Sequence, residues 1–363
     1  MPTQPGPRRG TGWIVAAGVA GVLVLVAATA FVALRLAGRS GATTPPTSSA
    51  AVSNTPTPVS TATRISSPAP TSRTITLPGT SVKVIERAGD PLRLTSYTVN
   101  SGKRLYVRKH ATGAFAQNSR YFDYVLNLRT NQALGTDVDY SSDFFSTVSV
   151  VDHSTGDKRV VKISRRPVYP TTPRWSPDGA YGLVTLYKGT AAGDTDEYGY
   201  AIIDVAAGTA RAFEIKEQGA GEWRFFWDAG GRAVGTWVAG RMKFYDLNGK
   251  HLRTLSDVGS PVWVEGDDVS PSGSRFLALC TTEGTSLCAR STSGDDPAPI
   301  TVPVAGKRLI GWWDDDHLAV WRAEGAGYEA VVTDLSGQVR RVLATAPRKA
   351  EFDRMGFRFS RTG

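Results

Sequence analysis

Two series of turn motifs recur through the chain at intervals of 42 to 52 residues, and this period limits the fold more than any other feature. In the first series, an aromatic or apolar residue precedes a polar turn and then an apolar strand. Its copies begin at Trp175, Trp227, Val269 and Trp313, with steps of 52, 42 and 44 residues. Such a period is typical of one supersecondary unit that stacks repeatedly.

The second series is an apolar strand that ends in Asp, followed by a glycine turn and another strand. Its Asp residues step by 52, 42 and 88 residues, and the last step equals two periods of 44. Because both series run in register, each unit contains two hairpins, which is the composition of a four-stranded propeller blade. The copies are Asp152 with Gly156, Asp204 with Gly208, Asp246 with Gly249 and Asp334 with Gly337.

One copy of the first series is the run Trp175, Ser176, Pro177, Asp178 and Gly179. This turn resembles the WD40-like repeats of bacterial TolB-type propellers, and the resemblance covers roughly residues 81–360. It implies an all-β propeller in which the turn joins the inner two strands of a blade. It implies no function, because such propellers have many roles.

The repeat predicts five complete blades, and a sixth formed by both ends of the domain. We expect strands around residues 83–109 to be completed by the last strand, Met355–Phe359, because a shared blade removes the open edges of a ring. Six blades are predicted, and seven is the alternative, since 290 residues at a period of 43 lie nearer seven. The complete blades are expected at 121–165, 172–217, 221–256, 262–303 and 308–345.

Residues 13–34 form an uncharged apolar run of 22 residues. As a helix it would rise about 33 Å, enough to cross a hydrocarbon core of about 30 Å. We therefore predict an uncleaved transmembrane signal anchor at 13–37 after a cytoplasmic stub at 1–12. The alternative is a cleaved signal peptide, whose apolar region is usually shorter.

The segment 38–73 is predicted to be a disordered linker, because it is rich in Ser, Thr, Pro and Ala and lacks apolar surface to bury. Linkers of this composition are typical of exported proteins, with or without O-glycosylation. We therefore expect an extracytoplasmic propeller at 74–363 in a single-pass protein of the cell membrane. The ectodomain is predicted to be monomeric.

The positive charge of the chain does not indicate nucleic-acid binding. Residues 1–73 carry six basic and no acidic side chains, so 36 basic and 33 acidic residues remain for the predicted propeller. A net charge of +3 without a Lys/Arg cluster is no electrostatic footprint for DNA or RNA.

Cys280 and Cys288 are the two cysteines of the chain. If Gly284 lies at the tip of a hairpin, each cysteine is four residues from it, and the two would face each other across antiparallel strands. We predict a structural disulfide, which suits an exported domain. The alternative is a pair of buried thiols in the blade core.

Sequence motifs of catalysis and of cofactor binding are missing. His110, His153, His251 and His317 have no metal-ligand spacing, and the chain has no GxSxG elbow and no phosphate-binding glycine loop. The acidic run 193–197 could bind Ca²⁺, but it lacks a full ligand spacing and is better explained as a solvated loop. We expect nine aromatic residues mainly to fill the core, namely Trp223, Phe225, Phe226, Trp227, Trp237, Trp263, Trp312, Trp313 and Trp321.

These observations favour a non-enzymatic binding or scaffold module that presents loops to an envelope protein or a small ligand. No catalytic residue, metal or cofactor is predicted. The alternative is an enzyme that acts on cell-wall glycan or an exported substrate, with its site in the propeller channel.

Overall fold

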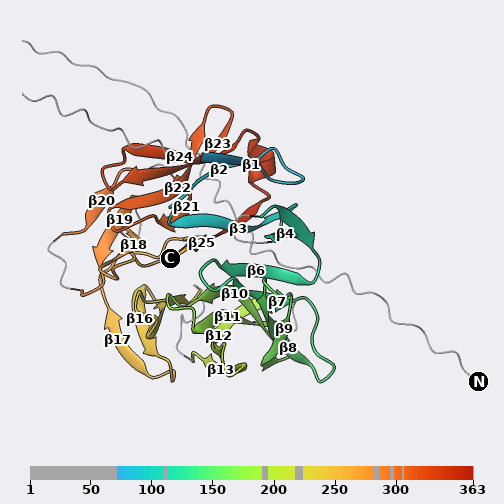
Figure 1. Cartoon of the computed structure of the whole chain (residues 1–363). Helices are drawn as coiled ribbons and strands as arrows, with labels where there is room; N and C mark the ends of the chain where they lie inside the picture. Colours follow the sequence, from blue (N-terminus) through green and yellow to red (C-terminus); the bar gives the residue numbers. More distant parts are fainter. Residues whose placement is uncertain are drawn as a thin grey trace, which may run out of the picture. The chain divides into compact units, whose positions relative to one another are not determined.

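Short strands with buried apolar residues, separated by glycine turns, make up nearly all of the chain that the computed structural model describes (Figure 1). The described residues are 72–109, 113–189, 195–216, 224–281, 286–294, 298–304 and 306–362. They belong to one compact unit, Pro70–Gly363. Within them the strands form six sheets, which we number as blades 1 to 6.

Blades 1 to 4 each contain four antiparallel strands, which follow one another from the channel outward. Blade 1 consists of β25 (Gly356–Arg361), β3 (Leu92–Val99), β4 (Arg104–Arg108) and β5 (Phe115–Asn118). Blade 2 consists of β6 (Tyr121–Asn127), β7 (Gln132–Asp137), β8 (Phe145–Asp152) and β9 (Lys158–Arg165). Blade 3 consists of β10 (Val168–Trp175), β11 (Tyr181–Gly189), β12 (Thr195–Asp204) and β13 (Thr209–Glu214). Blade 4 consists of β14 (Phe226–Trp227), β15 (Ala233–Val238), β16 (Arg241–Asp246) and β17 (His251–Leu255).

Blades 5 and 6 depart from this pattern. Blade 5 has β18 (Arg275–Leu279), β19 (Leu287–Ser291) and β20 (Ile300–Val302), preceded by a segment that makes only isolated bridges. Blade 6 has β21 (Gly306–Trp312), β22 (His317–Glu324), β23 (Gly327–Asp334) and β24 (Val339–Ala346), and two further strands at its outer edge. The sequence prediction of six blades is confirmed, and the seven-bladed alternative is wrong.

The Trp175 motif forms a turn between the first and second strands of blade 3, and we call the corresponding turns of all blades the inner turns. Ser176 Oγ accepts a hydrogen bond from Tyr181 N (2.9 Å) and donates one to Asp178 Oδ1 (2.6 Å). Gly179 closes the turn at φ +75°, and an added Cβ would lie 2.6 Å from Asn127 Nδ2 of blade 2. Glycine is therefore required both by the left-handed backbone and by contact with the preceding blade.

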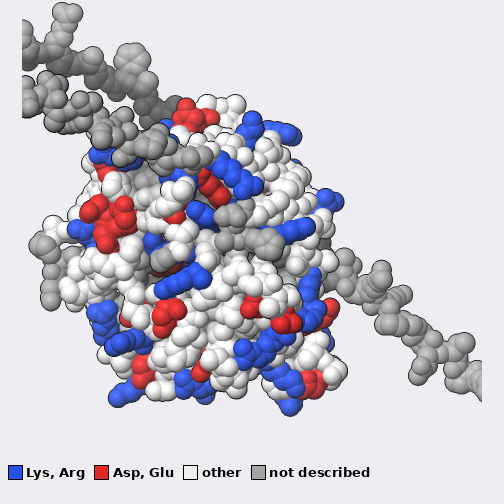
Figure 2. Space-filling view, in the orientation of Figure 1, with Lys and Arg blue, Asp and Glu red and all other residues white. Residues whose placement is uncertain are grey.

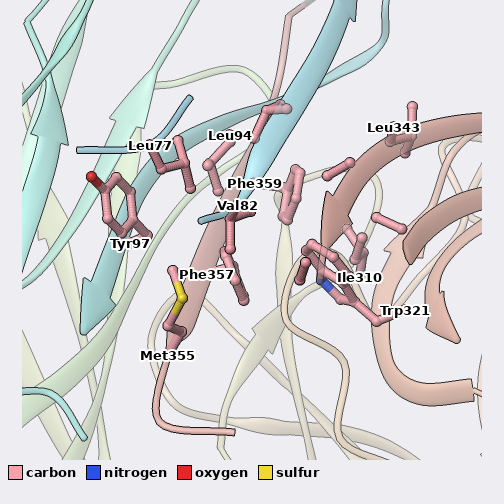
Figure 3. Packing of buried hydrophobic residues seen from close by; sticks show 14 of the residues in the cluster. Leu77, Val82, Leu94, Tyr97, Ile310, Trp321, Leu343, Met355, Phe357 and Phe359 are labelled. Atoms are coloured by element: carbon pink, nitrogen blue, oxygen red, sulfur yellow. The ribbon is translucent and has the colours of Figure 1, made fainter. Parts of the chain in front are cut away.

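The ring closes where the last strand, β25, pairs with β3, so blade 1 combines the C-terminal strand with three strands from the N-terminal part of the propeller. Figure 3 shows the core at this junction, where Phe357 and Met355 of the closing segment meet Trp321 and Tyr97. The Phe357 ring lies 4.9 Å from that of Trp321, and both side chains are buried. The predicted closure by the segment around Met355–Phe359 is confirmed.

The expectation that the strand around residue 83 belongs to this shared blade is wrong. β2 (Lys83–Arg87) pairs with β24 of blade 6, and β1 (Ser72–Thr76) pairs with β2, so both strands extend blade 6 outward. The physical reason is that β24 would otherwise present an unpaired edge, which β2 covers. Two ion pairs hold this extension, Arg108–Glu86 between blades 1 and 6 and Arg341–Asp90 at β24.

Cys280 and Cys288 form a disulfide with a Cα–Cα distance of 5.0 Å, as the sequence predicts. The expected register is wrong by two positions, because Cys288 lies opposite Ala278 rather than Cys280. The bridge therefore runs diagonally from β19 to the residue that follows β18.

In the described part of the chain, no helix is both long and apolar enough to span a bilayer. The predicted anchor at 13–37 and most of the predicted linker at 38–73 lie outside the described residues. Both remain predictions.

The closing strand should carry a large share of the stability of the ring. We expect Phe357→Ala to lower the free energy of unfolding by about 3–5 kcal/mol, because it removes a buried ring from contact with Trp321 and leaves a cavity. Urea denaturation of residues 70–363 measures the change. Val339→Ala, at a half-exposed position of β24, is the control and should change stability by less than about 0.5 kcal/mol. Equal effects of the two substitutions would contradict this role of β25.

The disulfide should stabilise blade 5 modestly, because it closes a short loop. We expect the double variant Cys280→Ser/Cys288→Ser to lose about 2–3 kcal/mol of unfolding free energy. Reduction of the wild-type protein should produce the same loss in urea denaturation. A wild-type protein insensitive to reductant would show that the bridge does not contribute.

Candidate functional site

Charged side chains from all six blades converge at the centre of the ring. The cations are five arginines of blades 1, 3, 4 and 6, and the anions are four carboxylates of blades 2 and 5. Among the described residues these are Arg174, Arg224, Arg308, Arg358 and Arg361, with Asp123, Glu265, Asp267 and Asp268.

Irregular strand pairing places several of these side chains. The ladders of β6, β10, β21 and β25 each shift register next to a residue of the group, at Asp123, Arg174, Arg308 and Arg358 respectively. A bulge breaks the alternation of side chains along a strand and redirects one of them. The inner strands can therefore point charged groups into the channel and still bury apolar residues between the blades.

Three of the four carboxylates lie on the segment 260–269, which precedes β18 of blade 5. This segment bridges β18 only at its two ends, through Ser260–Leu279 and Val269–Phe276. Between them, Val264 pairs in parallel with Leu309 of blade 6, and Glu265 N donates to Leu309 O at 2.8 Å. The segment that would form the innermost strand of blade 5 thus pairs with blade 6 in its middle instead of with β18.

Glycine permits this close crossing. Gly266 N donates to Ile310 O at 2.6 Å, and a Cβ on Gly266 would lie 2.7 Å from that oxygen. A Cβ on Gly311 would lie 3.1 Å from Asp267 O. Because both contacts are with backbone atoms, neither neighbour can move aside cheaply, and larger residues are excluded.

Ion pairs join the displaced segment to four other strands or strand ends. Asp268 lies 3.1 Å from Arg174 and 3.4 Å from Arg224, whereas Asp267 lies 2.6 Å from Arg361. Glu265 is 3.8 Å from Arg308, and Asp123 binds Arg358 at 2.8 Å. The pairs therefore join adjacent blades and blades two apart around the channel.

A cavity of about 230 Å³ lies beside this group. Its polar wall includes Arg174, Glu265, Asp267, Asp268, Arg358 and Arg361. Its apolar wall includes Pro173, Trp175, Pro177, Trp227, Ala229 and Pro271, so it extends from the channel to the inner turns of blades 3, 4 and 5. A concave site with an apolar wall and a few convergent polar groups is the usual form of a small-molecule site.

Several charged groups at the cavity have hydrogen-bonding capacity that the described residues do not use. Arg358 donates to Asp123 through Nε and Nη2, which leaves Nη1 without a described partner. Arg174 donates through Nη1 to Gly266 O at 2.5 Å, which leaves Nε and Nη2. Buried Glu265 Oε2 accepts no hydrogen bond from a described residue. The wall therefore offers donors, whereas the free acceptor of Glu265 is enclosed.

Burial changes the acid–base properties of two members of the group. It raises the pKa of Glu265 to about 7, against the opposing effect of Arg308, Arg358 and Arg224. Burial also lowers the pKa of Arg224 to about 9, and repulsion by Arg174 and Arg358 adds to this shift against the attraction of Asp268. At neutral pH, Arg224 is charged and Glu265 is poised between its two forms.

Thr172, which lines the cavity, has a left-handed backbone with φ +45°. A β-branched residue rarely adopts this conformation, and such strain is concentrated at functional sites. Thr172 lies within the register shift between Thr171 and Arg174. The same irregularity of β10 therefore produces the left-handed backbone and directs Arg174.

The residues that the sequence singled out lie mostly beside this site rather than in it. Trp175, Ser176 and Pro177 line the cavity, whereas Asp178 and Gly179 complete their turn outside it. The aromatic residues expected in the core are largely buried, and the half-exposed exception is Trp263, which stacks under Arg224 at 4.1 Å. Trp223 and residues 193–194 of the acidic run lie outside the described residues.

Sequence reasoning missed the channel charges themselves. They are distributed over several inner strands and one irregular segment, and no motif common to the blades marks them. The run Glu265-Gly266-Asp267-Asp268 is the one local signal that could have drawn attention to the displaced segment. In the described part of the chain, no group of three or more His, Cys, Asp or Glu side chains is placed to hold a metal ion.

The outer surface gives no competing electrostatic site on the face shown in Figure 2. Lys and Arg are interspersed there with Asp and Glu over the blades. Elsewhere in the described part of the chain, surface pairs such as Lys162–Asp143 and Arg340–Asp334 contribute little to stability.

No protein-family model matches the sequence, and a comparison with curated proteins finds no match either. Among solved structures, the chain is similar to TolB from Acinetobacter baumannii, with 14% identity, 76% of this chain and 67% of that chain covered, and a TM-score of 0.48. It is also similar to an oligogalacturonate lyase in complex with manganese, with 12% identity, 75% and 84% covered, and a TM-score of 0.46. Likeness at this level concerns the propeller fold and carries nothing about activity.

The raised pKa of Glu265 predicts a specific pH dependence of stability. Between pH 4.5, the usual pKa of the group, and about pH 7, the folded protein holds this proton more tightly than the unfolded chain. The contribution of Glu265 therefore falls as pH rises through this window, by at most about 1.4 kcal/mol per pH unit. Glu265→Gln should remove this component, so the variant should gain stability relative to wild type up to about pH 7.

Urea denaturation of both proteins at several pH values checks this prediction. Glu324→Gln, at an exposed position of β22, is the control and should follow the wild-type profile. Parallel profiles for wild type and Glu265→Gln would mean that Glu265 titrates as an ordinary carboxylate.

Proposed function

We propose that the chain is a membrane-tethered, non-enzymatic binding module whose propeller lies outside the cytoplasm. In this proposal, residues 13–37 anchor the protein with its N-terminus in the cytoplasm, and 38–73 link the anchor to the propeller. The disulfide supports the location, because such bonds persist in oxidising compartments.

The observation that carries the binding role is the cavity at the centre of the ring. Its wall comes from five blades, and the ion pairs of the channel hold that wall in place. A site whose groups are fixed in advance loses little conformational entropy when a ligand binds. Loops at the inner-turn face surround the cavity and would contact a larger partner.

A cross-linking experiment in intact cells tests this proposal. The full-length protein should capture a recurrent envelope protein, or a small ligand should stabilise residues 70–363 without being altered. The control retains residues 1–73 and lacks the propeller. Capture equal to the control, together with no stabilising ligand, would oppose the binding role.

A second candidate is an enzyme that acts on an exported substrate, and Glu265 is the observation that favours it. A buried carboxyl group with a pKa near 7 beside a cavity has the properties of a general acid or base. Turnover of a ligand by wild type that Glu265→Gln abolishes, while binding persists, would favour the enzyme over the binding module.

A further inference from the structure

The channel contains more guanidinium groups than its carboxylates balance. Five arginines face four carboxylates, and burial raises the pKa of the most buried of these, Glu265, so that its negative charge is the least secure of the four. Arg174 and Arg358 both repel Arg224, which shows that the cations crowd one another. An additional negative charge in the cavity would relieve this repulsion.

Some of these guanidinium groups have donors that are available to a ligand in the cavity. Nε and Nη2 of Arg174 and Nη1 of Arg358 have no hydrogen-bond partner among the described residues, and both side chains line the cavity. Arg129 lies exposed in the same wall, forms no ion pair with a described carboxylate, and donates to Pro177 O. Guanidinium groups bind oxyanions in particular, because their fork of donors matches two oxygens.

The apolar side chains of the wall indicate that the ligand also has an apolar part. Proline and tryptophan side chains lie between the arginines and the inner turns, so an apolar body can pack there. The volume of about 230 Å³ lies below the range of drug-sized pockets, which limits the ligand to a small molecule.

We propose that the channel cavity binds a small organic oxyanion, a carboxylate or phosphate monoester, whose charged end accepts hydrogen bonds from Arg174 and Arg358. Its body lies against Trp175 and Pro271, and Arg129 contributes long-range attraction at the rim. This inference rests on the proposed binding function and names the ligand class of that same cavity.

A matched set of probes tests the ligand class on residues 70–363. Benzoate and phenyl phosphate carry an oxyanion on a ring, benzyl alcohol is neutral, and benzylammonium carries the opposite charge. We expect the two anions to raise the melting temperature and to give saturable binding in calorimetry at low salt, and added chloride to weaken it. The neutral and cationic probes should not bind.

Three variants locate the site. Arg174→Gln should weaken binding of the anions by about tenfold or more, since it removes a charge-assisted donor. Arg129→Gln changes an exposed side chain, so it should fold normally and weaken binding by only a few-fold. Arg340→Gln, which alters a surface pair on β24, is the control and should bind as wild type does.

The outcomes separate this inference from the proposed function. If folded Arg174→Gln and Arg129→Gln both bind the anions as wild type does, or if the neutral or cationic probe binds better, the oxyanion site is wrong. If no probe binds while cross-linking captures a partner through the propeller, the ligand class fails and the binding function stands. If a bound anion is turned over, the oxyanion site stands and the non-enzymatic role fails.

Discussion

The pairing of β25 with β3 is the contact on which the rest of the structure depends, because it joins the C-terminal strand to blade 1 and closes the ring. Without it, β3 would present an open edge to the channel, and Phe357 would lose its contact with Trp321. The same strand brings Arg358 and Arg361 to the centre. The strand that closes the fold therefore also completes the candidate site.

The channel buries charged side chains and still belongs to a stable fold. Charges buried at the centre of a protein are costly unless they are paired, and each pair here joins different blades, so the cost falls only when the ring is complete. The displaced segment 260–269 supplies three of the four carboxylates, and its middle, at Glu265 and Gly266, donates main-chain hydrogen bonds to blade 6. The contact of this segment with β21 also fixes the wall of the adjacent cavity.

Much of the fold could be predicted because the repeat is local. The turn at Trp175 and its later copies fix where strands begin, and the periodicity gives the blades. The disulfide was predictable from spacing, although its register was not, since the strands pair about residue 283 rather than 284. The strand at Lys83–Arg87 was assigned to the wrong blade, because sequence alone does not say which exposed edge a strand will cover.

The propeller, its blades and the bonded cysteines could be predicted because each follows from patterns within a few tens of residues. The closing strand was predictable for a different reason, since a ring of blades must cover its open edges. Only the tertiary structure decided the candidate site. Asp123, Arg174, Glu265 and Arg358 come from four different blades, and three of them are directed inward by bulges that interrupt the strand pattern. Neither a bulge nor a contact across the ring has a local sequence signal, so a site built from both becomes visible only in the folded chain.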